Sequence, residues 1–367
     1  MLHIDGSYKS GGGQILRTAL ALSTLTHTAF SIDKIRSGKP KPGLKPQHLT
    51  CIKALKMFTN CHTENAEIES EKLEFTPGKI TTKSLKIDIR TAGSITLLLQ
   101  SLLPTLLFCE KKIKLTIKGG TDVSWSTPID NFNNVILLQL RPYTNSLDLK
   151  ILKRGYYPRG GGEVELIIDP KYKLSEHSTF EKFHQYLKEQ NKPIQLTEQP
   201  HLIKINGIVN ATKSLMKANV GERIKKSAQV ELKSLGVPIN IRVEYCDSLS
   251  DGCGITLWAT FSKDKNEITE PIILGADSLG KKGKKSEDVG TEAAQKLIKE
   301  IKSGAVVDKN TTDNLLPYLA LFQGQIKTSQ LTNHTLTNIY IIEQFLGKTF
   351  NIDEQTNIIT TKNHQHL

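Results

Sequence analysis

Three consecutive glycines near the start of the sequence, Gly11–Gly13, precede side chains that could bind an anion. Gln14 and Arg17 are three positions apart, so they share one face in the first turn of the apolar helix expected over residues 15–26. Glycine amides beside a helix start favour a bound anion, although such a turn can also simply precede a core helix. The stretch matches neither a Walker loop nor a Gly-x-Gly-x-x-Gly motif. Taken alone, the stretch therefore leaves open both a phosphate-binding turn and a structural turn that caps a core helix.

A basic, proline-rich loop is the second candidate site. Residues 36–48 contain four cations and three prolines, and the prolines oppose helix formation until the helix expected over residues 47–57. A basic loop that leads into a helix start suits phosphate binding, whereas an ordinary exposed turn is the alternative. The side chains that could bind phosphate here are those of Arg36, Lys39, Gln47 and His48.

His334 lies just before a helix expected over residues 339–346 and is flanked by small polar residues. An imidazole in such a place can be exposed in a cleft and act as a nucleophile or a base, whereas an incidental surface histidine is the alternative. Gln100 lies in the mainly apolar helix expected over residues 95–108. A buried amide needs a hydrogen-bond partner, which here is either a core group or a ligand.

The composition limits the class of protein. The chain has 367 residues, enough for two or three domains. Its net charge of +12 favours a polyanionic partner such as nucleic acid, with a lysine-rich solvated surface as the alternative. No apolar run reaches the roughly 18 residues of a membrane span, and we expect no signal peptide. Five scattered cysteines favour a reduced, intracellular protein over a disulfide scaffold or a zinc site.

The order of the expected elements indicates repeats of one α/β unit. The sequence turn, helix, strand recurs roughly every 80 residues, and a second triple-glycine turn, Gly160–Gly162, enters the strand expected over residues 164–168. Residues 171–195 are rich in Lys, Glu and His, so we expect an exposed excursion there. From residue 202, alternating strands and a lysine-rich helix indicate a small α/β insert.

Together these motifs resemble the RNA 3′-terminal phosphate cyclase family. The resemblance covers nearly the whole chain in the family's order and leaves out only residues 171–195 and the extreme C-terminus. The matching stretches are Asp5-Gly6, Gly11 to Arg17, Ile35 to Gly38, Lys41 to Leu44, Gln47 to Leu49, Ala92 to Ser94 with Gln100, Gly119 to Asp122, Gly155 to Pro158 with Gly160 to Gly162, and His334 with Leu336 to Asn338.

The resemblance implies a mixed α/β (α+β) fold. Three repeated units would each have a four-stranded sheet and two helices, and a smaller α/β domain would be inserted in the third. We therefore expect the first two repeats and the start of the third over residues 1–199, the insert over residues 200–275, and the remainder of the third repeat over residues 276–367.

The resemblance also implies an enzyme that uses ATP and Mg²⁺ or Mn²⁺ to convert an RNA 3′-phosphate end into a 2′,3′-cyclic phosphate. His334 matches the family's nucleophile, which carries AMP as a phosphoramidate before AMP passes to the RNA. Arg17, Arg36 and Lys39 would bind phosphates, while Gln14, Gln47 and His48 would position the RNA end or the nucleotide. The nucleotide pocket would comprise Gln100, Pro128, Asn310, Thr311, Thr312, Asp313 and Asn314, with Asp313, or alternatively Thr312, near the histidine.

Three positions depart from the family pattern. Ser10 stands where the family usually has a glutamate that contacts the metal, and a hydroxyl is a poor replacement for a carboxylate ligand. Lys39 stands where an arginine is common, so the bidentate fork is lost. Asn310 occupies a place where an aromatic side chain often stacks on adenine. These changes put metal affinity and nucleotide binding in question.

The main alternative is a catalytically inert relative that binds RNA or ribosome-assembly partners. Such relatives lack the nucleophilic histidine, which this sequence has at position 334. A third possible function, that of an enolpyruvyl transferase, rests on fold analogy alone. The context of His334 and the cationic composition are not features that its reaction requires. The sequence leaves open the RNA target, the oligomeric state and the choice between cytoplasm and nucleus.

Overall fold

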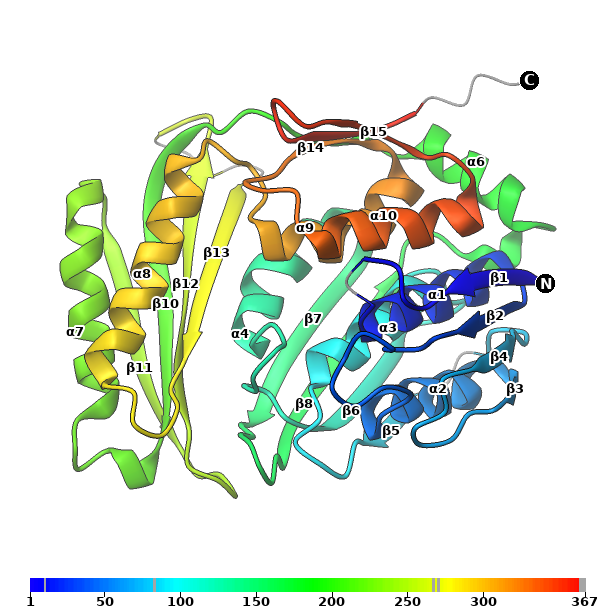
Figure 1. The fold of residues 1–367 in the computed structure, drawn as a ribbon. Helices are drawn as coiled ribbons and strands as arrows, with labels where there is room; N and C mark the ends of the chain where they lie inside the picture. The colour runs from blue at the N-terminus through cyan, green and yellow to red at the C-terminus, as the bar shows by residue number, and fades with distance from the viewer. Residues whose placement is uncertain (10, 82–83, 266–267, 269–270, 363–367) are drawn as a thin grey trace.

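The computed structural model describes residues 1–9, 11–81, 84–265, 268 and 271–362. Within these residues the chain forms four sheets of four strands, and three of the sheets share one topology (Figure 1). In each of the three, the first two strands in the sequence are parallel, and the last strand lies antiparallel between the second and the third. The mixed α/β class expected from the sequence is confirmed.

The three sheets follow one another along the chain. The first contains, in spatial order, β1 (Leu2–Asp5), β2 (Phe30–Asp33), β4 (Leu73–Thr76) and β3 (His62–Glu64). The second contains β5 (Leu85–Asp88), β6 (Ile113–Gly119), β8 (Gly162–Pro170) and β7 (Thr144–Lys153). The third contains β9 (Ile194–Leu196), β14 (Gly324–Lys327), β16 (Ile358–Thr361) and β15 (Phe350–Asp353).

Helices from the three units pack against one another in a single core. The main helices are α1 (Gly13–Thr26), α2 (Pro46–Thr59), α3 (Ile95–Leu106), α9 (Lys309–Phe322) and α10 (Asn333–Leu346). α1 contacts α2, α3 and α10, and α9 contacts α3 and α10. α1 and α3 are apolar on most sides because helices cover them from several directions, as expected of buried helices. This packing of helices from three units positions the candidate site.

The segment between β6 and β7 is helical but not regular. It consists of α4 (Ile129–Asn131), the π-helical turn η1 (Phe132–Ile136), α5 (Leu137–Leu140) and the 3₁₀ turn η2 (Arg141–Tyr143). The sequence predicts an amphipathic segment here, and most of its apolar side chains are buried. A π-helical turn inside a helix is frequent at functional sites.

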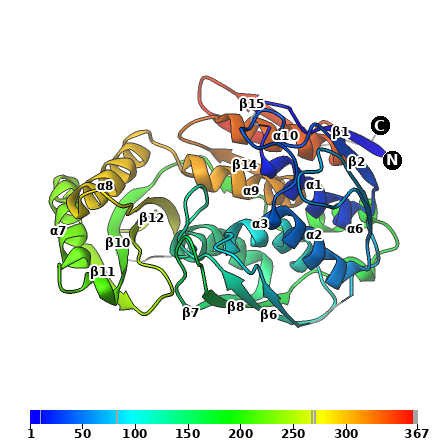
Figure 2. The same cartoon turned by 60° about the horizontal axis from the view of Figure 1, so that its bottom comes forward.

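A second core lies between β9 and α9 in the sequence. It contains a sheet in the order β11 (Ile239–Cys246), β10 (His201–Thr212), β12 (Cys253–Ser262) and β13 (Ile272–Leu279), together with α7 (Val220–Leu232) and α8 (Ser286–Lys302). In Figures 1 and 2 this unit lies to the left of the other three sheets. Because β13 and α8 pack into this core, we propose that the inserted unit continues to the end of α8, beyond residue 275.

The segment of residues 171–195 is not the exposed excursion that its composition predicts. Phe180, Phe183 and Leu187 of α6 (Phe180–Gln190) are buried in the main core, and β9 pairs in parallel with β14 of the third sheet. The apolar residues of α6 recur at helical spacing and form one buried face, while many charged residues occupy the other faces. The low average hydropathy of the segment therefore does not reveal the buried face.

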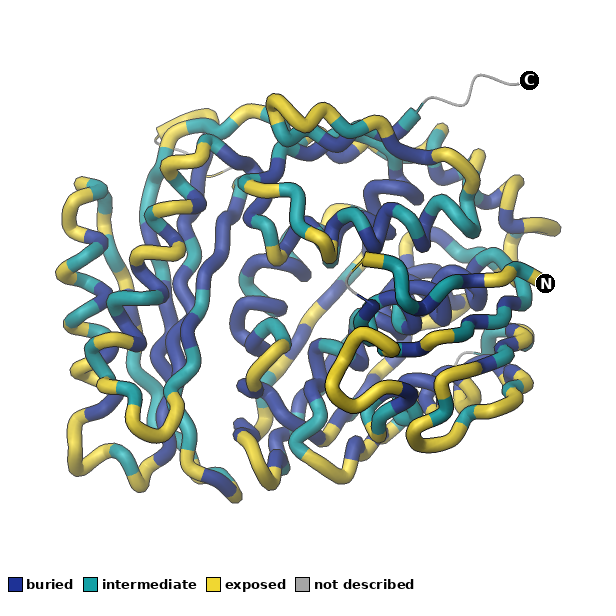
Figure 3. Tube along the Cα trace, in the orientation of Figure 1, coloured by how far each residue is buried: buried dark blue, intermediate teal, exposed yellow. Residues whose placement is uncertain are grey.

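The basic loop between β2 and α2 lies on the surface. Residues 37–42 are all exposed, whereas residues 18–25 of the neighbouring α1 are buried (Figure 3). The cations of this loop are therefore accessible to a large anionic partner.

Candidate active site

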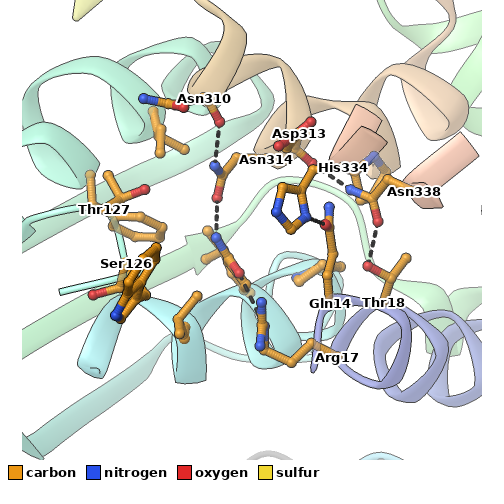
Figure 4. Close-up of a pocket in the computed structure, with 18 of the residues that line it drawn as sticks. Gln14, Arg17, Thr18, Ser126, Thr127, Asn310, Asp313, Asn314, His334 and Asn338 are labelled. Carbon is orange, nitrogen blue, oxygen red and sulfur yellow. Dashed lines mark hydrogen bonds between the residues drawn. The ribbon is translucent and has the colours of Figure 1, made fainter. Parts of the chain in front are cut away.

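A cavity of about 470 Å³ lies between α1, α3, α9 and α10 (Figure 4). The side chains that line it from these helices include Gln14 and Arg17 of α1, Leu97 and Gln100 of α3, Asn310, Asp313 and Asn314 of α9, and His334 and Asn338 of α10. The N-terminal turn of α1 carries partial positive charge, and Arg17 adds a full positive charge, so the cavity favours an anionic ligand. Gly12, the N-cap of α1, has no side chain with which to cap the helix, which leaves the first amides of α1 available.

His334 is the second residue of α10 and is exposed at the cavity. The helix begins here because the Thr332 hydroxyl accepts a hydrogen bond of 3.0 Å from the Thr335 amide. Nδ1 of His334 lies 2.6 Å from Oε1 of Gln14 (Figure 4). Since an amide oxygen can only accept, Nδ1 carries the proton of the neutral ring and Nε2 retains a lone pair. The contact therefore selects the tautomer in which Nε2 is nucleophilic.

A chain of polar side chains crosses the cavity wall from α1 through α3 to α9. Nε of Arg17 donates to Oε1 of Gln100 at 3.1 Å, and Nε2 of Gln100 donates to Oδ1 of Asn314 at 2.8 Å. Nδ2 of Asn314 donates in turn to the backbone carbonyl of Asn310 at 2.8 Å. Gln100 is thus bonded to other cavity residues rather than to unrelated core groups, and the chain orients the Arg17 guanidinium.

Asp313 stands where α9, α10 and α1 meet. Its Oδ1 accepts a 2.8 Å hydrogen bond from the Thr335 hydroxyl, and its backbone carbonyl accepts one of 2.5 Å from Nδ2 of Asn338. The Thr18 hydroxyl donates to Oδ1 of Asn338 at 2.6 Å, which ties α1 to the same group. Burial raises the pKa of Asp313 to about 7. These bonds hold the start of α10, and so His334, in place.

Burial and nearby cations keep both candidate histidines neutral. The pKa of His334 is lowered from its ordinary value by partial burial and then by the charges of Arg17 and Lys39. The pKa of His48 is lowered to about 3 by burial and by Arg17 and Arg36. Burial lowers the pKa of Arg17 to about 10, so this guanidinium is still cationic at neutral pH. The cavity therefore combines the neutral imidazole of His334 with the fixed positive charge of Arg17.

The basic loop approaches the same end of α1. Arg36 acts electrostatically on Arg17 and His48, and Lys39 acts on His334. Nη2 of Arg36 donates to the carbonyl of Lys41 at 3.4 Å, whereas its Nε is buried and has no hydrogen-bond partner among the described residues. Most buried donors have a hydrogen-bond partner, so this Nε is an exception.

Gly13 permits the close approach of His48 and Arg17. A Cβ at this position would overlap Nε2 of His48 and would lie 3.0 Å from Nη1 of Arg17. His48 is buried, and its Nδ1 accepts a hydrogen bond of 3.0 Å from the Lys45 amide at the start of α2. The triple-glycine turn thus makes room for neighbouring side chains as well as exposing amides.

Seven of the predicted site residues that the structure describes do not line the cavity: Arg36, Lys39, Gln47, His48, Pro128, Thr311 and Thr312. The Thr311 hydroxyl donates to Asp308 at 2.7 Å and the Thr312 hydroxyl to Thr328 at 2.7 Å, because these positions face the core side of α9. Pro128 is buried at the start of α4, beside the lining residue Thr127. Nε2 of Gln47 lies 3.5 Å from the carbonyl of Ser94.

Several lining residues were not identified from the sequence. Thr18 and Asn338 stand four positions after Gln14 and His334, so helical spacing could have found them. Asp277 of β13 and Lys296 of α8 come from the inserted unit, where Nζ of Lys296 donates to the carbonyl of Asp277 at 3.1 Å. No local sequence pattern predicts that Asp277 and Lys296 line the cavity, because only the packing of the inserted unit brings them there.

The described residues do not form a metal site by themselves. No group of three His, Cys, Asp or Glu side chains in the described ranges could hold a metal ion. Asp313 and Asp277 line the cavity, but burial raises the pKa of each, to about 7 and about 6, and both accept hydrogen bonds from protein groups. Ser10 lies outside the described residues, so the weakened metal binding expected there stays a prediction.

The fold and the cavity define a class: an α/β protein whose cavity places an arginine and a neutral histidine together. A family model described as RNA 3′-terminal phosphate cyclase matches residues 8–352. A protein of that name from Pyrococcus furiosus is 44% identical over 352 residues, which cover 96% of this chain and 95% of the relative. Another from Methanosarcina mazei is 38% identical over 359 residues, 97% of each chain. The chain therefore belongs to the RNA 3′-terminal phosphate cyclase family, and the resemblance seen in the sequence is confirmed.

The sequence predicts no membrane span and no disulfide scaffold. None of the helices in the described part of the chain is both long and apolar enough to cross a membrane. All five cysteines are described, and each is free: Cys51, Cys61, Cys109, Cys246 and Cys253.

Proposed function

We propose that this chain converts an RNA 3′-phosphate end into a 2′,3′-cyclic phosphate at the expense of ATP, with His334 as the nucleophile. The observation that carries the proposal is the 2.6 Å contact between Nδ1 of His334 and Oε1 of Gln14, which leaves Nε2 unprotonated beside an anion-binding cavity. The family of the chain supports the same activity.

In the first step, Nε2 of His334 attacks the α-phosphorus of ATP. A phosphorus–nitrogen bond forms, the bond from the α-phosphorus to the bridging oxygen breaks, and pyrophosphate leaves. The ring becomes cationic as the bond forms, while Nδ1 keeps its proton and its hydrogen bond to Gln14. A hydrogen bond from a group that gains charge becomes stronger, so Gln14 stabilises this step more than the ground state.

In the second step, an oxygen of the RNA 3′-phosphate attacks the same phosphorus and the phosphorus–nitrogen bond breaks, which returns the neutral imidazole. The vicinal 2′-hydroxyl oxygen then attacks the RNA phosphorus, loses its proton, and expels AMP to close the cyclic phosphate. The enzyme is thus regenerated, and each cycle uses one ATP.

The cations around the cavity would stabilise the phosphates in both steps. Arg17 is held by Gln100, Arg36 acts electrostatically on Arg17, and Lys39 acts on His334 from the exposed loop. Charge that develops on transferred phosphate oxygens is stabilised by such fixed donors. A cation close to the imidazole also keeps it unprotonated, because the cation opposes a second positive charge.

The test is covalent labelling of the purified chain with ATP that carries a label on its α-phosphate, with and without added Mg²⁺ or Mn²⁺. We expect acid-labile label on the parent protein and none on His334→Ala. His62→Ala, which removes an exposed histidine of β3 outside the cavity, should be labelled normally. Undiminished labelling of His334→Ala would refute the assignment, and absence of label on the parent would favour the inert RNA-binding alternative.

The proposed partners are therefore ATP and an RNA with a 3′-phosphate end. We retain as predictions an intracellular location, in the cytoplasm or the nucleus, and a requirement for Mg²⁺ or Mn²⁺. The five free cysteines support the reduced compartment, and the titration with metal in the labelling experiment addresses the cofactor.

A further inference from the structure

Trp125 is a large aromatic side chain that the structure leaves almost entirely in solvent. Its side chain is 98% exposed, although it belongs to the lining of the cavity described above. It sits in the loop between β6 and α4, next to Ser126 and Thr127, which also line the cavity. Figure 4 shows Ser126 and Thr127 on the side of the cavity opposite His334 and Gln14. None of the roles proposed for the polar residues of the cavity involves the indole of Trp125.

The backbone of Trp125 has an unusual conformation for such a residue. Its φ of +67° lies in the left-handed region, which is disfavoured for bulky side chains. Residues held in such conformations persist where the surrounding structure fixes them, and they cluster at ligand sites. No packing contact accounts for the strain, because the indole is not buried.

Hydrogen bonds on both sides hold this loop in place. The Ser126 hydroxyl donates to the carbonyl of Val123 at 3.0 Å, immediately beside Trp125. The buried hydroxyl of Thr96, in α3, donates to the carbonyl of Thr127 at 2.7 Å, and the Ile129 amide donates to the carbonyl of Thr121 at 3.0 Å. The indole is therefore presented at the cavity by an anchored loop rather than by a free segment.

A flat, exposed indole at a phosphate-binding cavity suits a nucleobase. Every base has a π-face that can stack on an aromatic side chain, so such a contact adds affinity without base identity. The cationic and polar groups, Arg17, Gln14 and His334, lie in the same cavity and would take the phosphates. If the phosphates of a nucleotide bind at these groups, its base lies at the other end of the cavity.

We propose that Trp125 is a stacking platform for a nucleobase of a substrate. The base is either the adenine of ATP or the terminal base of the RNA, and the experiment below separates the two. The identity of these ligands rests on the proposed function, whereas the stacking role rests on the exposure, backbone strain and anchoring of Trp125.

The experiment uses the intrinsic fluorescence of the indole. The sequence has two tryptophans, so Trp258→Phe, a change in strand β12 of the insert, leaves Trp125 as the single reporter. This protein is titrated separately with an ATP analogue that has a methylene group in place of the α,β-bridging oxygen, and with an RNA oligonucleotide that ends in a 3′-hydroxyl, so that neither ligand can react. We expect strong quenching by the ligand whose base stacks on Trp125, and the other ligand should bind with little quenching.

Substitutions then test whether the contact contributes to binding. Trp125→Ala should raise the dissociation constant of the quenching ligand roughly 5- to 100-fold, the usual range for a lost base–aromatic stack, and leave that of the other ligand unchanged. Trp125→Phe keeps a π-face and should restore most of the affinity. Ser124→Ala, at the neighbouring exposed position, should change neither constant.

The outcomes separate this proposal from the proposed function. Unchanged dissociation constants for both ligands in Trp125→Ala, or binding of both without quenching, would overturn the stacking role alone. If the parent protein bound neither ligand and His334 were not labelled, both proposals would fail together. A similar loss of affinity for ATP and RNA in Trp125→Phe and Trp125→Ala, with a lowered melting temperature, would assign Trp125 to loop stability and also overturn the stacking role.

Discussion

Gln14 and His334 are 320 positions apart in the sequence, yet Oε1 of Gln14 lies 2.6 Å from Nδ1 of His334. One residue is in the first turn of α1 and the other in the first turn of α10, and these two helices pack against each other. The contact fixes which nitrogen of the imidazole carries the proton. A helix of the first repeat thereby controls the chemistry of a side chain in the third.

The contact between Gln14 and His334 predicts that its removal slows the reaction of His334 with ATP. Gln14→Leu should slow the labelling of His334 by ATP about 10- to 100-fold, because a hydrogen bond to a group that becomes charged contributes roughly 1.5–3 kcal/mol. The imidazole would still be present but would no longer be held in one tautomer. Gln14→Glu, which keeps an acceptor, should retain more activity than Gln14→Leu. Single-turnover labelling rates measure both, and equal rates in Gln14→Leu and the parent would contradict the role of the contact.

The lowered pKa of His334 predicts the pH dependence of labelling. Only the neutral ring is a nucleophile, so the rate should be maintained as the pH falls to the ordinary histidine value of 6.5 and should decline only below it. Lys39→Gln removes a cation that lowers this pKa, so the midpoint should move upward, towards 6.5. Lys41→Gln, in the same exposed loop, should leave the midpoint unchanged. A parent midpoint above 6.5, or equal shifts in both variants, would be inconsistent with this electrostatic account.

Arg154 is predicted to stabilise the attachment of the inserted unit. It is 5% exposed, and its guanidinium contacts Asp130 at 2.7 Å, Glu244 of β11 at 2.8 Å and Asp122 at 3.5 Å. Arg154→Met leaves buried carboxylates without their cation, so the free energy of unfolding should fall by about 3–5 kcal/mol. Arg242→Met removes only an exposed partner of Glu244 and should cost about 0–1 kcal/mol.

Denaturant unfolding of both variants measures the difference. Similar small losses in the two variants would mean that the buried contacts of Arg154 contribute little. Because Asp277 and Lys296 reach the cavity from the inserted unit, Arg154→Met should also weaken ATP labelling at temperatures where it is folded.

RNA binding is predicted to weaken steeply with salt. The exposed cations of residues 34–45 and 281–285 form a surface that can contact phosphates, and each neutralised phosphate releases counterions. The logarithm of the affinity should fall linearly with the logarithm of the salt concentration, and the double change Lys39→Gln with Lys41→Gln should reduce the slope by about 1.4, or roughly 0.7 per single-strand contact. Lys284 is paired with Glu292, so Lys284→Gln should change the slope little. A flat salt profile would show that these charges do not contact the RNA.

Local patterns in the sequence determined much of this protein. The helix start after Gly11–Gly13, the buried helix that carries Gln100, and the small polar residues around His334 are all properties of neighbouring residues. The order of the motifs was enough to indicate the family, which the comparisons confirm. Helical periodicity in the sequence also predicts the buried face of α6 and the positions of Thr18 and Asn338, although it did not enter the predictions for these segments.

Only the tertiary structure decided which of these groups meet. Asn310, Asp313 and Asn314 face the cavity while Thr311 and Thr312 face the core, because the packing of α9 against its neighbours selects one side of the helix. β9 joins β14 across the entire inserted unit, and Asp277 and Lys296 enter the cavity only because that unit docks on the second sheet. The physical reason is that hydrophobic patterns report which face of an element is buried, whereas the partner that buries it is set by contacts between residues far apart in the chain.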